Sequence, residues 1–423
     1  MEVCVPTNPK SSLSARVSGG KARPAPGSET GKTPPPQIDA PKGVAILGST
    51  GSIGCNTLEV VKHLGAGYQI RALAAGSSWK KLAEQALATR PQVVALHDDK
   101  HLSELRNALA GTSINVVSGP DAMVEIACRP DVQVLVAAVV GAAGLRPVLA
   151  AAEAGKNIAL ANKEALVVAG VLVMPAIKAH GATLLPVDSE HSAVFQSLRS
   201  GTAGEIRKIT LTASGGPFRT WSAEKMKSAT ISQALDHPNW KMGPKITIDS
   251  ATMMNKALEI IEAHWLFGLP ADKIEVLIHP QSIIHSMIEF VDGSVIAQLG
   301  SPDMRTPIQY ALTHPERQPG CSTRLDWSKI KEMTFEQPDG RFPALELGFE
   351  VVRLGGTSGA VVNAANEVAN ESFRKGKITF RQIVELVQQV LVRHKHQGFI
   401  AQPTLEQLLA ADAWARSQVA TLT

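Results

Sequence analysis

Apolar residues in the first half of the chain fall into short runs separated by polar stretches with helical periodicity. The run at 43–47 leads through a glycine-rich stretch to Leu58, Val61 and Leu64, which recur at helical spacing. Further apolar runs lie at 68–75, 93–96, 116–117, 132–140 and 157–160. Buried-strand runs alternating with helical patterns predict a parallel sheet covered by helices on both faces.

The C-terminal part of the chain has a different pattern. From residue 343 onward helical spacing dominates, as in Ile383, Leu386, Val387 and Val390, which predicts an α-helical domain at 341–423. Residues 314–340 are proline-rich and mixed, and we interpret them as a linker.

Residues 1–41 lack apolar periodicity and are rich in Pro, Ser, Gly, Lys and Arg, so we expect a disordered tail. Their acid-poor composition also fits an organelle transit peptide, although Glu2 and the many prolines argue against it. The expected location is therefore the cytoplasm, with the plastid stroma as the alternative if the tail is a transit peptide.

Composition narrows the function classes. A chain of 423 residues with 44% hydrophobic and 19% charged residues is expected to form two or three globular domains. A net charge of +4 without a basic stripe argues against nucleic acid, and the apolar runs are too short to span a bilayer. The four scattered cysteines suggest neither a zinc site nor a disulfide framework.

The stretch from Gly48 to Gly54, GSTGSIG, stands between a predicted strand and a predicted helix. Backbone N–H groups and the helix dipole favour an anion there, which predicts a nucleotide site, although the spacing differs from G-x-G-x-x-G. The next strand ends in Gly76, Ser77 and Ser78 without the acid that binds the ribose of NAD. The strand end has no acid but two hydroxyls, with Lys80 and Lys81 nearby. Such donors favour a 2′-phosphate and therefore NADP. For the two lysines, a solvated first helical turn is the alternative.

Two carboxylates follow the apolar run at 182–187. If the strand continues through Glu190, Asp188 and Glu190 share one face, where they repel each other unless a cation lies between them. A solvated turn is the alternative interpretation. Lys163, just past another strand end, is placed to reach cofactor or substrate, or to be an ordinary surface lysine.

Three later motifs carry further candidate chemistry. Ser214 with two glycines predicts a small anion nest. The proline-bracketed 236–244, with Trp240 and Met242, suits a loop that closes over a ligand, and ordinary packing of Trp240 is the alternative. In the helix expected from Asp249, Ser250 is a candidate N-cap.

Within that helix, Asn255 and Lys256 lie four and three residues before Glu259. They predict either an ordinary helical ion pair or a phosphate site beside a carboxylate. Asp188, Glu190 and Glu259 would together make an all-oxygen site suited to Mg²⁺ or Mn²⁺.

Eight motifs resemble the 1-deoxy-D-xylulose 5-phosphate reductoisomerase family in number and order, from residue 42 to the C-terminal helices. They are GSTGSIG, LANKEALV, LLPVDSEHSAVFQ, ASGGPFR, HPNWKMG, DSATMMNKALE, HPQSIIHS and PDMRTPIQYAL. The resemblance implies an α/β fold with a Rossmann-like NADP-binding domain at 42–188 and an α+β catalytic domain at 189–313. The C-terminal helical domain follows the linker, and the family is homodimeric.

The resemblance also implies a role for each matching residue. The metal ligands are Asp188, Glu190 and Glu259, for Mg²⁺ or Mn²⁺ and also Co²⁺. The substrate contacts are Ser189, Glu190, Ser214, His237, Ser250, Asn255, Lys256, Glu259 and Met304. The catalytic residues are Lys163, Glu190, His191, His237, Trp240, Met242 and His285, with the three histidines lining the site. The NADPH contacts are Gly48, Thr50, Gly51, Ser52, Ile53, Gly76, Ser77, Ser78, Asn162, Lys163, Glu164 and Gly243.

The implied reaction rearranges the carbon skeleton of 1-deoxy-D-xylulose 5-phosphate and reduces the resulting aldehyde with NADPH, giving 2-C-methyl-D-erythritol 4-phosphate for isoprenoid synthesis. The implied partner is therefore a small phosphosugar. One alternative is another NADP-dependent dehydrogenase of the aspartate-semialdehyde type, which needs a nucleophilic cysteine; none of the cysteines falls in a catalytic-looking motif. A non-catalytic NADP sensor is the other alternative, but it has no need of three acids.

Overall fold

The computed structural model describes residues 40–119, 121–240 and 242–423. The tail predicted at 1–41 lies outside these residues except for its last two. No helix of the described ranges is long and apolar enough to cross a membrane.

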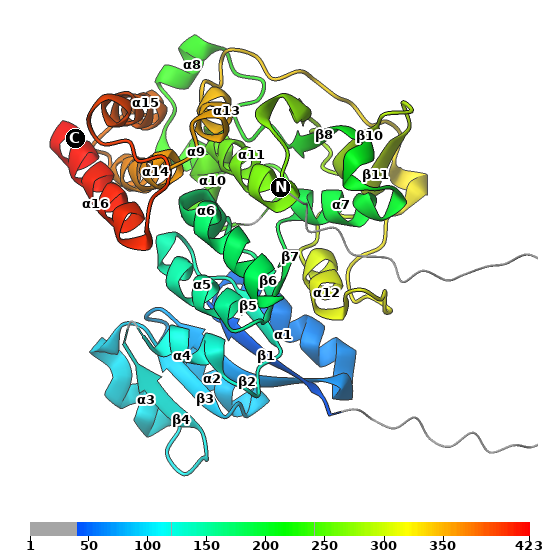
Figure 1. The fold of residues 1–423 in the computed structure, drawn as a ribbon, viewed down its shortest axis with the longest axis vertical. Helices are drawn as coiled ribbons and strands as arrows, with labels where there is room; N and C mark the ends of the chain where they lie inside the picture. The colour runs from blue at the N-terminus through cyan, green and yellow to red at the C-terminus, as the bar shows by residue number, and fades with distance from the viewer. Residues whose placement is uncertain (1–39, 120, 241) are drawn as a thin grey trace, which may run out of the picture.

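The N-terminal half forms a seven-stranded parallel sheet in the order β4-β3-β2-β1-β5-β6-β7, which confirms the predicted α/β fold. Its strands are β1 Lys42–Leu47, β2 Tyr68–Ala75, β3 Val93–Leu96, β4 Asn115–Ser118, β5 Val134–Ala137, β6 Asn157–Leu160 and β7 Thr183–Pro186. Its helices are α1 Ser52–Leu64, α2 Trp79–Thr89, α3 Leu102–Ala108, α4 Ala122–Cys128, α5 Leu145–Glu153 and α6 Lys163–His180. Figure 1 shows this sheet and its helices in blue, cyan and green.

The strand order reverses between β1 and β5, so the loops that follow these two strands diverge and leave a crevice for a ligand. Gly48 follows β1 with φ +85°, and a Cβ there would lie 2.3 Å from the carbonyl oxygen of Ala138, just after β5. Only glycine permits both the positive φ and this close approach. The glycine-rich loop is thereby held against the end of β5.

A second, smaller sheet has the order β11-β10-β8-β9, with antiparallel pairs except for parallel β8 and β9. Its strands are β8 Ile206–Ala213, β9 Ile274–Ile278, β10 Ile284–Phe290 and β11 Val295–Leu299. The associated helices are α7 Ser189–Ser197, α8 Ala223–Lys227, α9 Ile231–Leu235, α10 Pro244–Ala251, α11 Met254–Phe267 and α12 Arg305–Thr313. Helix α7 packs on β10 and β11, whereas α12 returns to pack on α1 of the first sheet.

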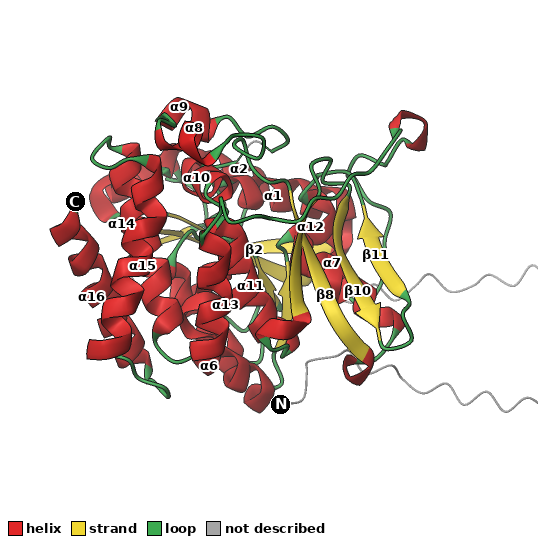
Figure 2. Cartoon of the chain, turned by 90° about the horizontal axis from the view of Figure 1, so that it is seen from above, coloured by secondary structure: helices red, strands yellow, loops and turns green. Residues whose placement is uncertain are grey.

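Four helices complete the chain: α13 Ala344–Leu354, α14 Ser358–Arg374, α15 Phe380–Gln397 and α16 Leu405–Leu422. Helix α14 lies between α15 and α16 and also packs on α6, while α13 packs on α11 (Figure 2). The predicted helical C-terminal part is confirmed. Because α6 contacts both α11 and α14, the N-terminal sheet, the second sheet and the C-terminal helices pack closely together. The domain boundaries predicted from the sequence stay predictions.

Two local predictions were wrong. The strand expected to run through Glu190 ends at Pro186; Asp188 caps helix α7 instead, and its side chain accepts the backbone N–H of Glu190. An N-cap carboxylate satisfies an otherwise unpaired helix N–H, which favours the helix over a longer strand. The helix expected from Asp249 is broken into α10 and α11 by Met253, at φ +61°, so that Ser250 lies in the last turn of α10 and is not an N-cap.

A glycine on α14 tests the packing of the C-terminal helices on α6. A Cβ at Gly359 would lie 2.0 Å from the carbonyl oxygen of Val167, so the Gly359→Ala variant must push the helices apart. We expect its free energy of unfolding to fall by about 1–3 kcal/mol, measured by urea denaturation. The control is Gly204→Ala, where a Cβ has no neighbour within 4 Å and stability should be nearly unchanged. Equal stability of the two variants would contradict this packing.

Candidate functional site

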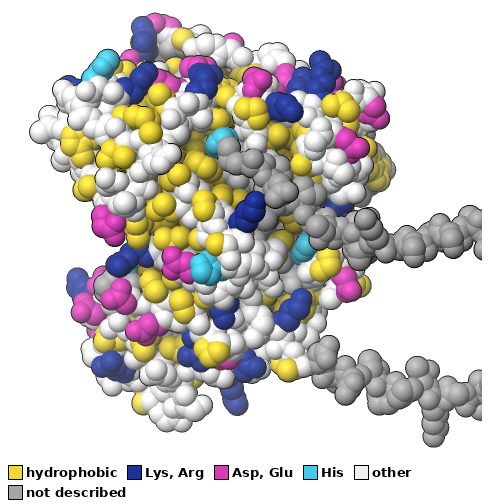
Figure 3. Space-filling model, in the orientation of Figure 1, with side chains coloured by type: hydrophobic (Ala, Val, Ile, Leu, Met, Phe, Trp, Pro, Cys, Tyr) yellow, Lys and Arg dark blue, Asp and Glu magenta, His cyan; other side chains and the backbone are white. Residues whose placement is uncertain are grey.

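One large cleft, with a volume of about 1080 Å³, lies where the glycine-rich loop, helices α6, α7 and α11 and the 237–246 segment meet. In Figure 3 apolar side chains gather at the waist between the N-terminal sheet and the rest of the molecule. The cleft is thus lined on one side by the loops that follow β1 and β5, and on the other by the residues that follow β7 and those at the start of α11.

Three carboxylates converge in this cleft. Asp188 and Glu190 come from the N-terminus of α7, and Glu259 from α11, with oxygens all within 4.8 Å of one another. Because residues i and i+2 at a helix N-terminus do not share a face, the convergence depends on the N-cap position of Asp188 and not on strand alternation.

Two lysines lie among these acids. Lys163, the first residue of α6, donates to Asp188 at 2.6 Å, to Glu259 at 3.0 Å and to the Asn255 side-chain oxygen at 2.9 Å. Lys256 pairs with Glu259, as Asn255 also does. The alternative of an ordinary surface position for Lys163 was wrong, because its side chain is 6% exposed.

The charges shift one another's pKa values. Burial lowers the pKa of Lys163, but Asp188 and Glu259 outweigh it and hold this pKa well above its usual value, so the ammonium stays charged. Burial also raises the pKa of Glu190 to about 8, aided by the repulsion of Glu259 and Asp188 and opposed by Lys256. The cleft therefore holds one carboxyl group that keeps its proton near neutral pH until more positive charge arrives.

This donor set fits a hard divalent cation. Its atoms are carboxylate oxygens, which Mg²⁺ and Mn²⁺ prefer, and they offer no thiolate or imidazole. Burial, and after it the repulsion of Glu259 and Asp188, raises the pKa of Glu190, and a bound cation would oppose both effects.

His237 connects the 237–246 segment to the Ser-Gly-Gly turn. Its Nδ1 accepts the backbone N–H groups of Asn239 and Trp240, at 3.2 and 3.0 Å. The ring proton is therefore on Nε2, which donates to Ser214 Oγ at 3.0 Å. Burial lowers the pKa of His237, which favours this neutral form.

Lys245, which the sequence did not single out, lies on the other side of the loop. It pairs with Glu164 at 2.8 Å and with Asp249 at 2.9 Å. Asp249 in turn accepts from Asn366 and Asn370 of α14. A buried polar network thus connects the end of the loop to α6 and to the C-terminal helices.

The structure brings most of the predicted site residues to the cleft. Those that line it are Gly51, Ser52, Ile53, Lys163, Glu164, Asp188, Ser189, Glu190, Ser214, His237, Trp240, Met242, Gly243, Ser250, Asn255, Lys256, Glu259 and Met304.

His191 and His285, which were expected to line the site, do not. His191 is fully buried behind Asp188, because α7 turns it towards α11. His285 is 6% exposed on β10, and burial lowers its pKa to about 4.

Six predicted cofactor residues also lie outside the cleft lining: Gly48, Thr50, Gly76, Ser77, Ser78 and Asn162. Asn162 supports the site indirectly, since its amide donates to Glu164 and to the backbone of Gly141. Lys81 donates to the backbone oxygen of Thr50, whereas Lys80 lies over the Trp79 ring. Lys81 thus braces the glycine-rich loop.

Several cleft residues were missed: Asn56, Ala138, Val139, Val140, Asn239, Lys245, Met253, Ser282, Ser301, Asp303 and Arg305. Residues 138–140 follow a strand at the sheet's reversal, a signal that was present in the sequence. Met253 and Ser282 have positive φ (61° and 51°), a strained conformation that gathers at functional sites and that no sequence pattern announced.

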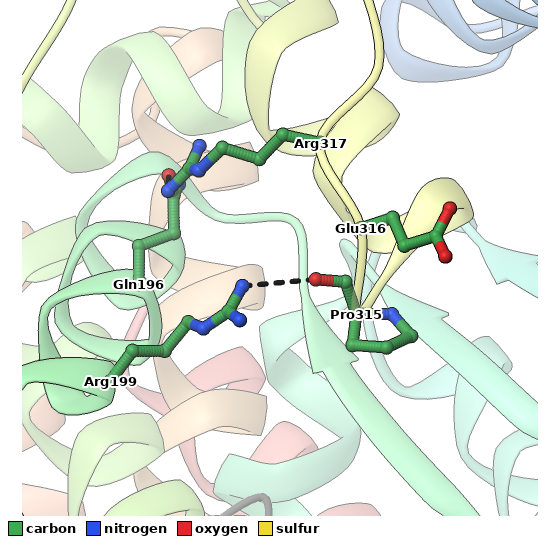
Figure 4. A pocket seen from close by; sticks show the side chains of 5 residues that line it. All are labelled: Gln196, Arg199, Pro315, Glu316 and Arg317. Carbon is green, nitrogen blue, oxygen red and sulfur yellow. Dashed lines mark hydrogen bonds between the residues drawn. The ribbon is translucent and has the colours of Figure 1, made fainter. Parts of the chain in front are cut away.

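None of the cysteines in the described residues lines the cleft, which leaves a cysteine-dependent dehydrogenase without its nucleophile there. A second, open concavity is formed by Gln196, Arg199, Pro315, Glu316 and Arg317 (Figure 4). Arg199 donates to the Pro315 backbone and Arg317 to Gln196, so both guanidinium groups already serve the protein.

Comparison with known proteins agrees with this arrangement. Residues 44–170 match the family profile described as 1-deoxy-D-xylulose 5-phosphate reductoisomerase. Residues 184–267 match the profile of its C-terminal domain, and 299–418 match a further profile, DXP reductoisomerase C-terminal domain.

Curated relatives and solved structures carry the same name. The reductoisomerase of Pelotomaculum thermopropionicum is 51% identical over 378 residues, 89% of this chain and 97% of the relative. The reductoisomerase of Heliobacterium modesticaldum is 53% identical over 378 residues, which cover 89% of this chain and 96% of the relative. The solved reductoisomerase from Zymomonas mobilis in complex with NADPH is 47% identical, with a TM-score of 0.84 over 90% of this chain and 99% of that one.

A second solved structure, of DOX-P reductoisomerase in complex with NADPH, fosmidomycin and magnesium, is 42% identical, with a TM-score of 0.85 and the same coverage. The matching profiles are spread along the chain, and the relatives are about half identical to it over nearly their whole length. Both findings agree with a site made of the convergent acids and the glycine-rich loop. The chain belongs to the 1-deoxy-D-xylulose 5-phosphate reductoisomerase family.

Proposed function

We propose that this protein converts 1-deoxy-D-xylulose 5-phosphate to 2-C-methyl-D-erythritol 4-phosphate with NADPH and a divalent metal, a step towards isoprenoid precursors. The observation that carries the proposal is the meeting of Asp188, Glu190 and Glu259 in the cleft that also contains the glycine-rich loop. Membership of the family and its solved complexes with NADPH and magnesium support it.

Asp188, Glu190 and Glu259 would hold Mg²⁺ or Mn²⁺, and Co²⁺ as a further candidate. The bound cation would supply a Lewis acid for a ketone and its neighbouring hydroxyl. Lys163 holds two of the three carboxylates in place. Its raised pKa makes it a fixed positive charge that donates hydrogen bonds, and not a base.

The phosphate of the substrate would lie against Ser214, Ser250, Asn255 and Lys256, which supply hydroxyls, an amide and an ammonium within the cleft. Ser189 and Met304 would contact the rest of the substrate. His237 orients Ser214 and at the same time holds the backbone of Trp240, so phosphate binding and loop position are mechanically coupled. Trp240 and Met242 would then cover the substrate and exclude water.

NADPH would bind with its phosphates at 50–53 and its nicotinamide end near Asn162, Glu164 and Gly243. Gly76, Ser77 and Ser78, beyond β2, would take the adenosine end, as in other folds of this type. Ser77 and Ser78 supply donors and no carboxylate, which supports NADP over NAD.

A homodimer is part of this proposal. Strand β11 forms an edge of the second sheet and exposes Val295 and Ile296, 54% and 36% accessible. An unpaired apolar edge is a surface that a second copy can cover. For location we propose the cytoplasm, with the plastid stroma as the alternative that residues 1–41 would decide.

The activity is tested by following NADPH absorbance with 1-deoxy-D-xylulose 5-phosphate, with EDTA and with added Mg²⁺ or Mn²⁺. We expect oxidation only with metal, and a loss of at least about 100-fold in turnover for Glu259→Gln, because one charged metal ligand is gone. NADPH binding by this variant, followed by fluorescence, should be retained. Metal-independent oxidation, or near-normal turnover of the variant, would refute the assignment.

Metal binding should depend on pH through Glu190. Its raised pKa of about 8 means that a proton competes with the cation below this pH and leaves when the cation binds. The dissociation constant for Mg²⁺ alone, measured by calorimetry, should therefore fall about tenfold between pH 6.5 and pH 8.0. In the Glu190→Gln variant, which has no proton to release, binding should be weaker and this part of the pH dependence should vanish. If both proteins respond equally to pH, the Glu190 proton is not involved.

The dimer is tested at the β11 edge. Val295→Lys and Ile296→Lys place charges where we expect a second copy to bury apolar side chains. Light scattering after gel filtration should give a dimer mass for the parent protein and a monomer mass for the double variant. Val392→Lys, on an equally exposed valine of α15, is the control and should stay dimeric. A double variant that also stays dimeric would place the interface elsewhere.

A further inference from the structure

Two helices each present a pair of polar residues three positions apart. On α7 the pair is Asp188 and His191, and on α11 it is Glu259 and Glu262. Residues three apart lie on the same side of a helix, one turn from each other. Each helix therefore directs one carboxylate into the cleft and places a second polar side chain directly behind it.

His191 joins the two pairs. Its Nε2 donates to the backbone oxygen of Glu259 at 2.8 Å, while Nδ1 lies 3.3 Å from Asp188 Oδ1 and 3.2 Å from Glu262 Oε2. The ring also stacks on Phe267, at 6.4 Å between centroids and 14° between planes. The position of Asp188 relative to Glu259 thus depends on how this one ring is held.

Glu262 is a carboxylate in a fully buried position on α11. It has no exposed surface, and neither carboxylate oxygen has a partner of good hydrogen-bond geometry in the described residues, so its ion pair with His191 is its main compensation. Burying a carboxylate is unfavourable because the group loses its hydration, and an apolar side chain of similar size would pack here without that penalty. Packing alone therefore does not account for Glu262.

We propose that Glu262 is a positioning residue that holds His191 and, through it, fixes Asp188 and Glu259 in the arrangement that binds the divalent cation. This inference rests on the proposed function, because it gives Glu262 a part in the same metal site. A carboxylate behind a ligand-orienting histidine acts on affinity without touching the cation.

The same three side chains, Asp188, His191 and Glu262, also bring ligand atoms within 4.8 Å of one another. The structure favours a support over a second cation site, since His191 and Glu262 have no exposed surface and neither lines the cleft.

The test is the dissociation constant of Mn²⁺, the probe metal, measured by electron paramagnetic resonance on the full-length protein without substrate. Glu262→Leu should weaken Mn²⁺ binding about 10–100-fold and leave the affinity for NADPH unchanged. Glu262→Gln, which keeps the shape and an oxygen facing Nδ1, should lose less than the leucine variant. If Glu262→Leu binds Mn²⁺ as tightly as the parent, or Glu262→Gln loses as much as Glu262→Leu, the proposal is wrong.

A double-mutant cycle separates positioning from general damage. If Glu262 acts through His191, the His191→Gln variant with Glu262→Leu added should bind Mn²⁺ no more weakly than His191→Gln alone. Additive losses would contradict the proposal. Thr357→Val is the matched control, because it removes the partner of another buried histidine, His394, away from the cleft. It should leave Mn²⁺ binding unchanged.

Measurements on the parent protein and on Glu259→Gln distinguish a failure of the proposed metal site from a failure of the proposed role of Glu262. If the parent binds no Mn²⁺, or Glu259→Gln binds it equally well, the proposed metal site fails. If the parent binds Mn²⁺ and Glu259→Gln does not, a failure in the Glu262 variants concerns Glu262 alone. Circular dichroism and the unfolding midpoint identify a variant that does not fold, and Glu262→Gln with the cycle on that milder substitution then decides the question.

Discussion

The structure depends on compensating a group of buried charges where α6, α7 and α11 meet. Asp188, Glu190, Glu259 and Glu262 are balanced by Lys163, Lys256 and the ring of His191. Each of these groups alone would be expensive to bury, and each is tolerated only because the others lie within a few ångströms. Lys163 follows β6 and Asp188 follows β7 of the first sheet, whereas Glu259 and Glu262 lie on α11, between β8 and β9 of the second sheet. The cluster is therefore complete only when the two parts pack together.

The rest of the fold keeps these three helices in place. Helix α6 carries Lys163 at its first residue and runs between α11 and α14, so the C-terminal helices support the charged cluster without reaching it. A second network anchors the residues that follow Met242. It runs from Glu164 through Lys245 and Asp249 to Asn366 and Asn370. The loop over the cleft is therefore held at one end by this network and at the other by His237.

The same electrostatics explains why the cleft suits a divalent cation. Three carboxylates face two lysines, and burial together with the repulsion of Glu259 and Asp188 raises the pKa of Glu190. A bound cation favours the charged carboxylate, so metal binding and the proton equilibrium of Glu190 are linked. The oxygens sit at the end of the crevice left by the reversal of strand order, where a nucleotide and a second ligand can meet.

The sequence by itself determined the periodic parts of the protein. The strands at 68–75, 93–96 and 157–160 have the bounds that their apolar runs predicted, and the glycine-rich loop follows β1 as expected. Long shared motifs identified the family, and with it most of the residues that line the cleft. These features are local, because a run of apolar residues or a glycine at a tight turn has the same consequence wherever the chain later folds.

Only the tertiary structure decided how the candidate residues face one another. Asp188 and Glu190 meet through a helix cap and not through a strand, and Ser250 lies in the last turn of a helix where it was expected to begin one. His191 and His285 are buried and do not line the cleft. The roles of Lys245 and Glu262 depend on Glu164 and His191, which lie 81 and 71 positions away in the chain. The direction of a side chain at a helix end, and the charge it meets when buried, are set by packing between distant segments, which no local pattern of residues contains.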